Sequence, residues 1–385
     1  MRVDAISCSD GMFGRRLAAR VTFEDGPTGS HDLEFTIDQM PGYSAAAGDV
    51  LAAACFPLAV HHGEKRMQID AEVCPRLRDG LAEIHALWRS WSLAGSAVPA
   101  IEARRGSPAQ RLPVSRPRQG CFLSGGVDSL HMLWRNLQDF AQGDPGRFSH
   151  GYIVHGFDIG KKPGRPQQGR FGRARAALLA IAAETDLELV SAASNIRRIP
   201  VRPDFWLYQQ HGGALAAIAH LASTGNLRVS LAATQDARSL RPNGSHPLLD
   251  PCYSSEGVQI RHWGLRFSRL DKLRELRAWP TAFRHLRVCP SAYSEELNCG
   301  DCEKCIRTRL ELLAIGVEGT EALGGSLVPP EAIAAAVQIE SPFQAACYRD
   351  LLEPLAAQGH RRIVAAIRQE LGRFEGRNRR RRAAA

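Results

Sequence analysis

A run of serine, glycine and aspartate residues between a short apolar segment and a helical segment is the clearest place for chemistry. The run reads Ser124-Gly125-Gly126-Val127-Asp128-Ser129. Residues 121–123 read as a short buried strand, and the apolar spacing over 130–137 predicts a helix. Adjacent glycines let a ligand approach the backbone, while serine hydroxyls and the free amides of a helix start offer donors to an anion. The run therefore predicts a phosphate-binding turn, and because no lysine follows, it is not a Walker loop.

Four cysteines near residue 300 form a second constellation. Cys289, Cys299, Cys302 and Cys305 have the spacing C-x9-C-x2-C-x2-C. A Cys-Gly-x-Cys knuckle turns two sulfurs inward, and two further thiols can complete a tetrahedral shell around one ion. We expect zinc in a structural role, because four thiolates leave no open coordination position. The remaining cysteines lack such spacing and are expected to be ordinary thiols.

The segments that must position these residues alternate between short apolar runs and helices. Predicted strands lie at 121–123, 151–156, 187–191 and 227–233, with helices at about 129–140, 171–185 and 212–223. This alternation is typical of an α/β fold with a parallel sheet and helices on both faces, in which ligands bind beyond the C-terminal strand ends. The rule brings to one crevice residues 124–129, Gly156, Phe157, Asp158, Asn195, Thr234, Gln235 and Asp236.

Further polar segments are candidates for contacting substrates at this crevice. Gly212-Gly213 opens an Ala- and Leu-rich helix, whose first amides favour an anionic group such as a carboxylate. His246, in the loop 243–251, could act as an acid or base near neutral pH. A lone loop histidine is more often structural, so this expectation rests on its place in the fold. Arg173 and Arg175 could reach a triphosphate, although exposed helix arginines are normally a solvated face.

The Ser-Gly-Gly-Val-Asp-Ser turn after an apolar strand resembles the signature of the N-type PP-loop ATP pyrophosphatases. In that family the loop holds the β- and γ-phosphates of ATP, a substrate oxygen attacks the α-phosphate, and pyrophosphate leaves. The resemblance implies an adenine-nucleotide alpha-hydrolase-like (HUP) sheet, with Ser124 and Asp128 in catalytic roles. It also implies that adenine lies against the main chain near His155 to Phe157, with Phe157 either as an apolar wall or merely as core. Asp128 could orient the loop or hold the Mg²⁺ that arrives with ATP, and Asp158 and Asp236 are weaker candidates for that ion.

The combination of this turn with the cysteine knuckle and the basic helix start at 305–309 is similar to the 7-cyano-7-deazaguanine synthases, the QueC type of PP-loop enzyme. In that family ATP activates the carboxylate of 7-carboxy-7-deazaguanine, ammonia gives the amide, and a second activation gives the nitrile, with zinc held by four cysteines. The resemblance covers about residues 120–313. QueC-like enzymes with extra domains also occur in bacterial antiphage clusters, where the deazaguanine can be attached to a protein, and this chain is closer to that elaborated type.

The leading hypothesis is therefore an AMP-forming C–N ligase that uses ATP, Mg²⁺ and Zn²⁺. It would join a deazaguanine-type acid to ammonia or a protein amine, with Ser124, Asp128 and His246 in catalysis. The alternative is a tRNA-modifying PP-loop enzyme that delivers sulfur to an adenylated base, in which Cys302 and Cys305 would be functional. It ranks lower because Cys289 completes a redox-silent shell. A third class is a nucleotide-binding defence or scaffold protein that has lost turnover.

The composition of the chain indicates the class of protein that carries these sites. The 385 residues, 44% apolar and 23% charged, describe a globular protein with a sizeable core. No signal-like or membrane-spanning apolar segment is found, so we expect a cytoplasmic protein whose cysteines are thiols and metal ligands. The net charge of +9 is mostly arginine and supports nucleic-acid binding only weakly.

The expected organisation has six segments. They are a small α+β domain at 1–93, a linker at 94–119, the PP-loop domain at 120–288, a zinc module at 289–320, C-terminal helices at 321–372 and a disordered basic tail at 373–385. In the first segment, alternation over 17–23 and 33–37 predicts two strands, 66–71 is a candidate third strand, and 50–60 and 77–91 have helical spacing. This segment is expected to orient a substrate or to dock a protein partner.

Overall fold

The computed structural model describes residues 1–12, 14–26, 29–38, 46–106, 117–159, 165–290 and 296–383. Parts of five predicted segments lie outside the described residues. They are 13, 27–28 and 39–45 of the first domain, 107–116 of the linker, 160–164 of the PP-loop domain, 291–295 of the zinc module and the last two residues of the tail.

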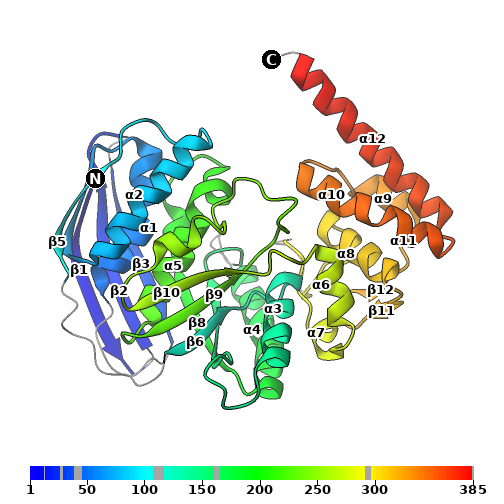
Figure 1. Ribbon diagram of the computed structural model, residues 1–385, viewed down its shortest axis with the longest axis horizontal. Helices are drawn as coiled ribbons and strands as arrows, with labels where there is room; N and C mark the ends of the chain where they lie inside the picture. The colour runs from blue at the N-terminus through cyan, green and yellow to red at the C-terminus, as the bar shows by residue number, and fades with distance from the viewer. Residues whose placement is uncertain are drawn as a thin grey trace.

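Ten strands of the described chain form one mixed sheet (Figure 1), in the order β10-β9-β6-β7-β8-β3-β2-β1-β4-β5. The strands are β1 (Arg2–Gly11), β2 (Gly14–Phe23), β3 (Gly29–Ile37), β4 (Arg66–Val73), β5 (Ala100–Arg105), β6 (Arg118–Phe122), β7 (His150–His155), β8 (Glu188–Ser194), β9 (Leu227–Ala232) and β10 (Val258–Trp263). Adjacent strands from β10 to β8 are parallel. Between β6 and β9 the order reverses direction, which makes this junction a topological switch point.

The N-terminal strands continue the same sheet. Phe35 to Ile37 of β3 pair antiparallel with Ala192 to Ser194 of β8, and β2 and β1 follow antiparallel. β4 and β5 then complete the edge in parallel pairing. Alternate residues of β2, including Leu17 and Val21, are buried while their neighbours are more exposed, as expected where one face of a sheet is solvated.

Helices cover the sheet on two sides and define two apolar cores. α1 (Ala47–His62), α2 (Pro75–Ser90) and α5 (His211–Ala222) belong to one core. α3 (Val127–Asp139) and α4 (Arg165–Thr185) belong to the other. α1 is apolar on almost every side and is buried along most of its length, because it packs on β4, α2 and α5. The first core therefore joins elements from both halves of the chain.

The C-terminal third adds a group of helices to the second core. They are α6 (Arg269–Leu276), α7 (Pro280–Arg284), α8 (Glu303–Ala314), α9 (Pro330–Ala336), α10 (Pro342–Asp350), α11 (Leu352–Ala357) and α12 (Arg361–Ala383). Between α8 and α9 runs a short ladder of β11 (Gly319–Thr320) with β12 (Gly324–Gly325). In Figure 1 this group lies to the right of the sheet, and the end of α12 projects away from it.

These elements confirm the predicted α/β class with a mostly parallel sheet in its second half. The structure adds β1, β5 and β10, which were not predicted, and β5 lies within the range predicted as a linker. It also differs at the C-terminus, where α12 continues to Ala383 through much of the predicted disordered tail. Ile363, Ile367 and Phe374 anchor that helix by burying a helically spaced stripe against the second core. The division into domains stays a prediction.

None of the helices in the described ranges has the length and apolar character needed to span a bilayer.

Candidate active site and metal centre

A cleft opens at the switch point of the sheet. Its empty space is about 1090 Å³ including the open mouth, which leaves room for a small molecule. Its walls come from the C-terminal ends of β6, β7 and β9 and from the loops that follow them. The lining residues include Leu123, Ser124, Asp128, Ser129, Val154, Phe157, Asp158, Ala232, Thr234, Gln235, His246 and Arg287. The strand-end rule applied to the sequence therefore places the cleft correctly.

The glycine-serine turn forms one wall of this cleft. Gly126 is the N-cap of α3, and Gly125 has a φ of +75°, a left-handed conformation that favours glycine. The Ser124 hydroxyl accepts the Gly126 N–H at 3.2 Å, and the Ser129 hydroxyl donates to the Gly126 carbonyl at 3.1 Å. The first amides of α3, from Val127 onward, have no partner within the helix and lie at its positive end. The first α3 amides can therefore bind an anion at this wall, whereas the Gly126 N–H and the Ser129 hydroxyl proton are engaged within the turn.

Asp128 is held by a lysine that the sequence analysis did not single out. Lys272 of α6 donates to Asp128 Oδ1 at 2.7 Å and also to the carbonyl of Ala233, just beyond β9. The lysine side chain is only 1% exposed, whereas Asp128 is 22% exposed and lines the cleft. This pair joins α3, α6 and the end of β9, so the Asp128 carboxylate is fixed at the cleft wall with part of its surface open to a ligand.

Arg287 joins the same wall from the C-terminal part of the chain. Its side-chain Nε donates to the carbonyl of Ser124 at 2.9 Å, and its backbone N–H donates to the carbonyl of Gly125 at 2.8 Å. The guanidinium lines the cleft, where it adds a positive charge beside the α3 amides. Arg287 therefore fixes the conformation of the turn from outside and contributes to its attraction for anions.

Of Gly156 and Phe157, which were predicted to contact adenine, only Phe157 lines the cleft. Phe157 lines the cleft while its ring also packs edge-on against Trp206, with ring centroids 5.1 Å apart, so the wall and the core roles coexist. Gly156 does not line the cleft. Its φ is +94°, and a Cβ there would lie 1.9 Å from the Ser194 carbonyl oxygen, so the glycine is needed for close contact with β8.

Some of the other predicted site residues line the cleft and others do not. Asp158, Thr234 and Gln235 line the cleft. Asn195 instead bonds the backbone of β3, accepting from Glu34 and donating to Asp32. Asp236 turns away to Arg238 and Ser239, which hold its pKa below the ordinary range despite partial burial. Arg175 donates to Ser191, and Arg173, like Arg175, is absent from the cleft wall.

The glycines at the start of α5 do not form an anion site. A short π-helix, Trp206–Gln210, runs directly into α5, so the α5 amides are not the open start of a helix. A Cβ on Gly212 would lie 2.0 Å from the carbonyl oxygen of Gly244, and one on Gly213 would lie 2.6 Å from that of Ala53. The sequence interpretation as a carboxylate site was wrong here, because both glycines serve close backbone packing.

His246 lines the cleft, as expected from its place in the fold. Its Nδ1 accepts the Leu248 N–H at 3.2 Å, and the Trp91 ring packs edge-on against it from just beyond α2. Burial, aided by the nearby His262, lowers the pKa of His246, so its neutral form is favoured. With Nδ1 accepting, that neutral form carries its proton on Nε2 and acts as a donor.

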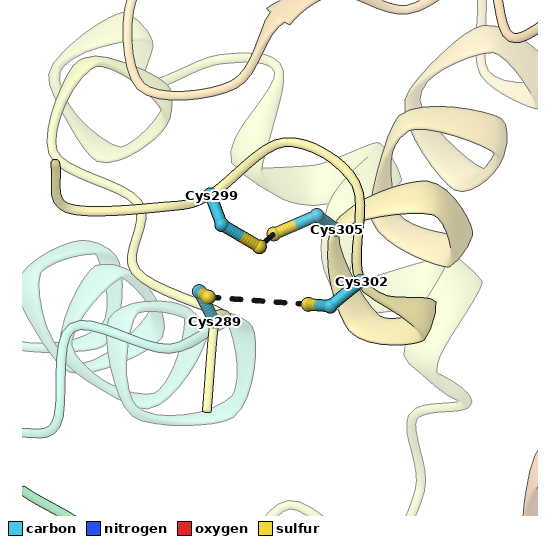
Figure 2. Close-up of side chains that lie close together, drawn as sticks. All are labelled: Cys289, Cys299, Cys302 and Cys305. Carbon is cyan, nitrogen blue, oxygen red and sulfur yellow. Dashed lines mark hydrogen bonds between the residues drawn. The ribbon is translucent and has the colours of Figure 1, made fainter. Parts of the chain in front are cut away.

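The four predicted cysteine ligands converge on one point (Figure 2). Their sulfurs all lie within 4.8 Å of one another, and the pairs Cys299–Cys305 and Cys289–Cys302 are both 3.9 Å apart. Four sulfurs about 2.3 Å from a tetrahedral zinc ion would lie about 3.8 Å from one another. The cluster therefore fits a metal ion such as zinc, with Cys302 as N-cap of α8 and Cys305 in its first turn.

The metal centre is connected to the cleft through the segment before Cys289. The Asn298 side chain accepts the backbone N–H groups of Val288 and Cys289 and donates to the carbonyl of Leu286. The buried Arg170 of α4 donates to the carbonyl of Cys289 at 3.0 Å. Arg287 lies within this braced segment, so the metal centre can fix the arginine that contacts the turn.

Lys272, Arg287, Asp250 and His262 were missed from the sequence. Asp250 is within a loop that had been singled out, but its partner His262 lies in an unpredicted strand. Arg287 stands two residues before a metal ligand, and that proximity was the one available signal. Lys272 has no motif around it, because its role arises only when α6 packs on α3.

Comparison with known proteins found no matching family model, no similar curated protein and no similar solved structure.

Proposed function

We propose that the cleft binds ATP and that the protein is an AMP-forming ligase that activates a carboxylate. The observation that carries the proposal is the convergence of the α3 amides, the Ser124 and Ser129 hydroxyls and Arg287 on one wall of a cleft at the switch point. Such a wall matches the charge and donor needs of a polyphosphate. The resemblance of the turn to PP-loop enzymes supplies the reaction class and the HUP identity of the sheet.

In this proposal the β- and γ-phosphates lie against the α3 amides and the two serines. Arg287 offsets the charge that grows on the departing pyrophosphate. Asp128, held by Lys272, orients the turn and offers an oxygen to the Mg²⁺ that accompanies ATP. The substrate carboxylate attacks the α-phosphorus, the bond to the β-phosphate breaks, and an acyl adenylate and pyrophosphate result. An amine then attacks the acyl carbon, and AMP leaves.

The rest of the cleft suits a flat acid with a polar edge. Phe157 and Val154 provide apolar wall, and Gln235, Asn243 and Ser245 offer donors and acceptors. A deazaguanine-type acid, the substrate class implied by the resemblance, has this combination of a flat ring and polar edges.

The sulfur-transfer alternative has less support. All ten cysteines lie in the described ranges, yet none of them lines the cleft. Four of them face one another in the cluster that fits a structural metal ion. A thiolase would need a thiol or a cluster facing the adenylated base, so the ligase is the better match to these positions.

Trapping with hydroxylamine tests the proposed function. The protein is incubated with Mg²⁺, ATP, 7-carboxy-7-deazaguanine and hydroxylamine, and hydroxamate and pyrophosphate are quantified against reactions without the acid. We expect both products in equal amounts, and their loss in Ser124→Ala. Pyrophosphate formation that does not depend on any acid in a panel of flat heterocyclic carboxylates would contradict carboxylate activation.

A further inference from the structure

A buried carboxylate organises the histidine-bearing end of the cleft. Asp250 begins the short helix Asp250–Tyr253 and is 1% exposed. Its Oδ2 accepts the Ser245 hydroxyl and the His262 Nδ1, each at 2.7 Å, and its Oδ1 accepts the His246 N–H at 3.2 Å. His262 comes from the end of β10 and its side chain is 6% exposed. One carboxylate thus fixes two histidines that both line the cleft.

The hydrogen bonds determine which nitrogen of each ring faces a ligand as donor or acceptor. Because the Asp250 carboxylate accepts from Nδ1 of His262, the neutral His262 ring carries its proton on Nδ1 and has a lone pair on Nε2. Among the described residues, the His262 ring makes no other hydrogen bond. His246 has the opposite arrangement, since its Nδ1 accepts the Leu248 N–H and its Nε2 is the donor. The cleft therefore contains one histidine suited to accept a proton and one suited to donate a hydrogen bond.

We propose that His262, oriented by Asp250, is the base that deprotonates the acceptor amine in the second half of the reaction. This proposal rests on the proposed function and adds a residue and a subsite to it. An amine is largely protonated near neutral pH, and the buried negative charge of Asp250 favours a cation at this end of the cleft. The Asp250 bond holds the proton on Nδ1 and fixes the ring while Nε2 takes a proton, as in other His–carboxylate pairs.

The step balances without any further reactant. His262 Nε2 first takes a proton from the ammonium ion and passes it to solvent. The neutral amine nitrogen then attacks the acyl carbon of the acyl adenylate, a C–N bond forms, and a second proton moves from nitrogen to His262 Nε2. The C–O bond to AMP then breaks and AMP leaves with its electron pair. The products are the amide, AMP and a protonated His262, which returns its proton to solvent. His246, as a neutral donor, is placed to hold an oxygen of the substrate and not to act as this base.

A purely structural reading would treat Asp250 as a clamp for the loop before it. The bonds to Ser245 and to the His246 backbone fit that reading. The bond to His262 is not needed for holding the loop. It fixes an imidazole that lines the cleft and whose Nε2 makes no bond to another described residue. Asp250 is thus a positioning residue, and His262 is the residue that contacts the reacting amine.

The test compares two nucleophiles on the same acyl adenylate. Hydroxylamine is uncharged near neutral pH and attacks without a base, whereas ammonium must first lose a proton. We expect the ratio of amide formation to hydroxamate formation to fall by roughly 10²–10⁴-fold in His262→Gln, the usual contribution of a general base. Asp250→Asn should lower the ratio in the same direction, because it removes the charge that orients the ring. If His262→Gln does not fold, His262→Gly is assayed with and without added imidazole, which should restore amide formation.

His150 provides a matched control. It also pairs with a carboxylate, with its Nε2 3.2 Å from Glu188, but it lies at the start of β7, away from the cleft. His150→Gln should leave the ratio unchanged. An unchanged ratio in His262→Gln, or no effect of imidazole on His262→Gly, would overturn the assignment of the base. Absence of hydroxamate from the wild-type protein would instead overturn the proposed function itself, so the two failures are distinguishable.

Discussion

The contact between Arg287 and the turn gives a prediction of defined size. In Arg287→Met the side chain keeps most of its length and apolar stem but loses its charge and its hydrogen bond to the Ser124 carbonyl. The backbone bond from residue 287 to the Gly125 carbonyl is retained. The substitution therefore removes the hydrogen bond from the guanidinium to the turn and leaves the backbone contact between residues 287 and 125 intact.

The magnitude follows from the kind of bond that is lost. A hydrogen bond that involves a charged group contributes about 1.5–3 kcal/mol. If that free energy is expressed in the binding of a triphosphate to an ordered turn, the Kd for ATP rises about 10- to 150-fold. The lost attraction between the guanidinium and the phosphates acts in the same direction.

Titration calorimetry with Mg²⁺ and α,β-methylene-ATP measures this effect without turnover. Arg284→Met is the matched control, because Arg284 pairs with Glu321 on the surface, where the two side chains are 49% and 72% exposed. A pair of that kind contributes at most about 1 kcal/mol to stability and has no contact with the turn. Equal Kd values for the two variants, with both folded, would refute the role given to Arg287.

Three further predictions concern the same wall and the metal. Lys272→Met should lower the free energy of unfolding in urea by about 3–5 kcal/mol, because it leaves Asp128 unpaired. The double variant with Lys272→Met and Asp128→Asn should recover part of that loss. Equal stability of the single and double variants would count against the pair. Gly125→Val should abolish ATP binding while the protein stays folded, because the φ of +75° at residue 125 is closed to a β-branched residue. Normal ATP binding by calorimetry would show that the turn is not the phosphate site. Cys302→Ser should give little soluble protein and no bound zinc by mass spectrometry of the native protein; a stable, fully active variant would show that the ion is dispensable.

Local patterns predicted some of these features and could not predict others. The turn at 124–129 and the four cysteines are recognisable because their chemistry is contained in short spacings. Lys272 and Asp128 are 144 residues apart, and Arg287 and Ser124 are 163 apart. Such contacts depend on how α6 and the segment before Cys289 pack, which no local periodicity encodes.

The N-terminal strands show the same limit at the level of the fold. The alternation in β2 and β3 predicts strands with one buried face. It does not predict that β3 pairs with β8, because edge pairing depends on which strand remains free at the edge of the parallel sheet. Likewise the glycines at the start of α5 fit a ligand site and a packing site equally well until the backbone of residue 244 is placed against them.

The proposed function requires that ATP is cleaved between its α- and β-phosphates at the turn that begins α3. Phosphorus NMR of a reaction containing Mg²⁺, ATP, 7-carboxy-7-deazaguanine and ammonium measures that cleavage directly. AMP and pyrophosphate should appear together with the wild-type protein and should be absent with Asp128→Asn. ADP and phosphate as the products, or AMP and pyrophosphate formed equally well by the variant, would contradict the account.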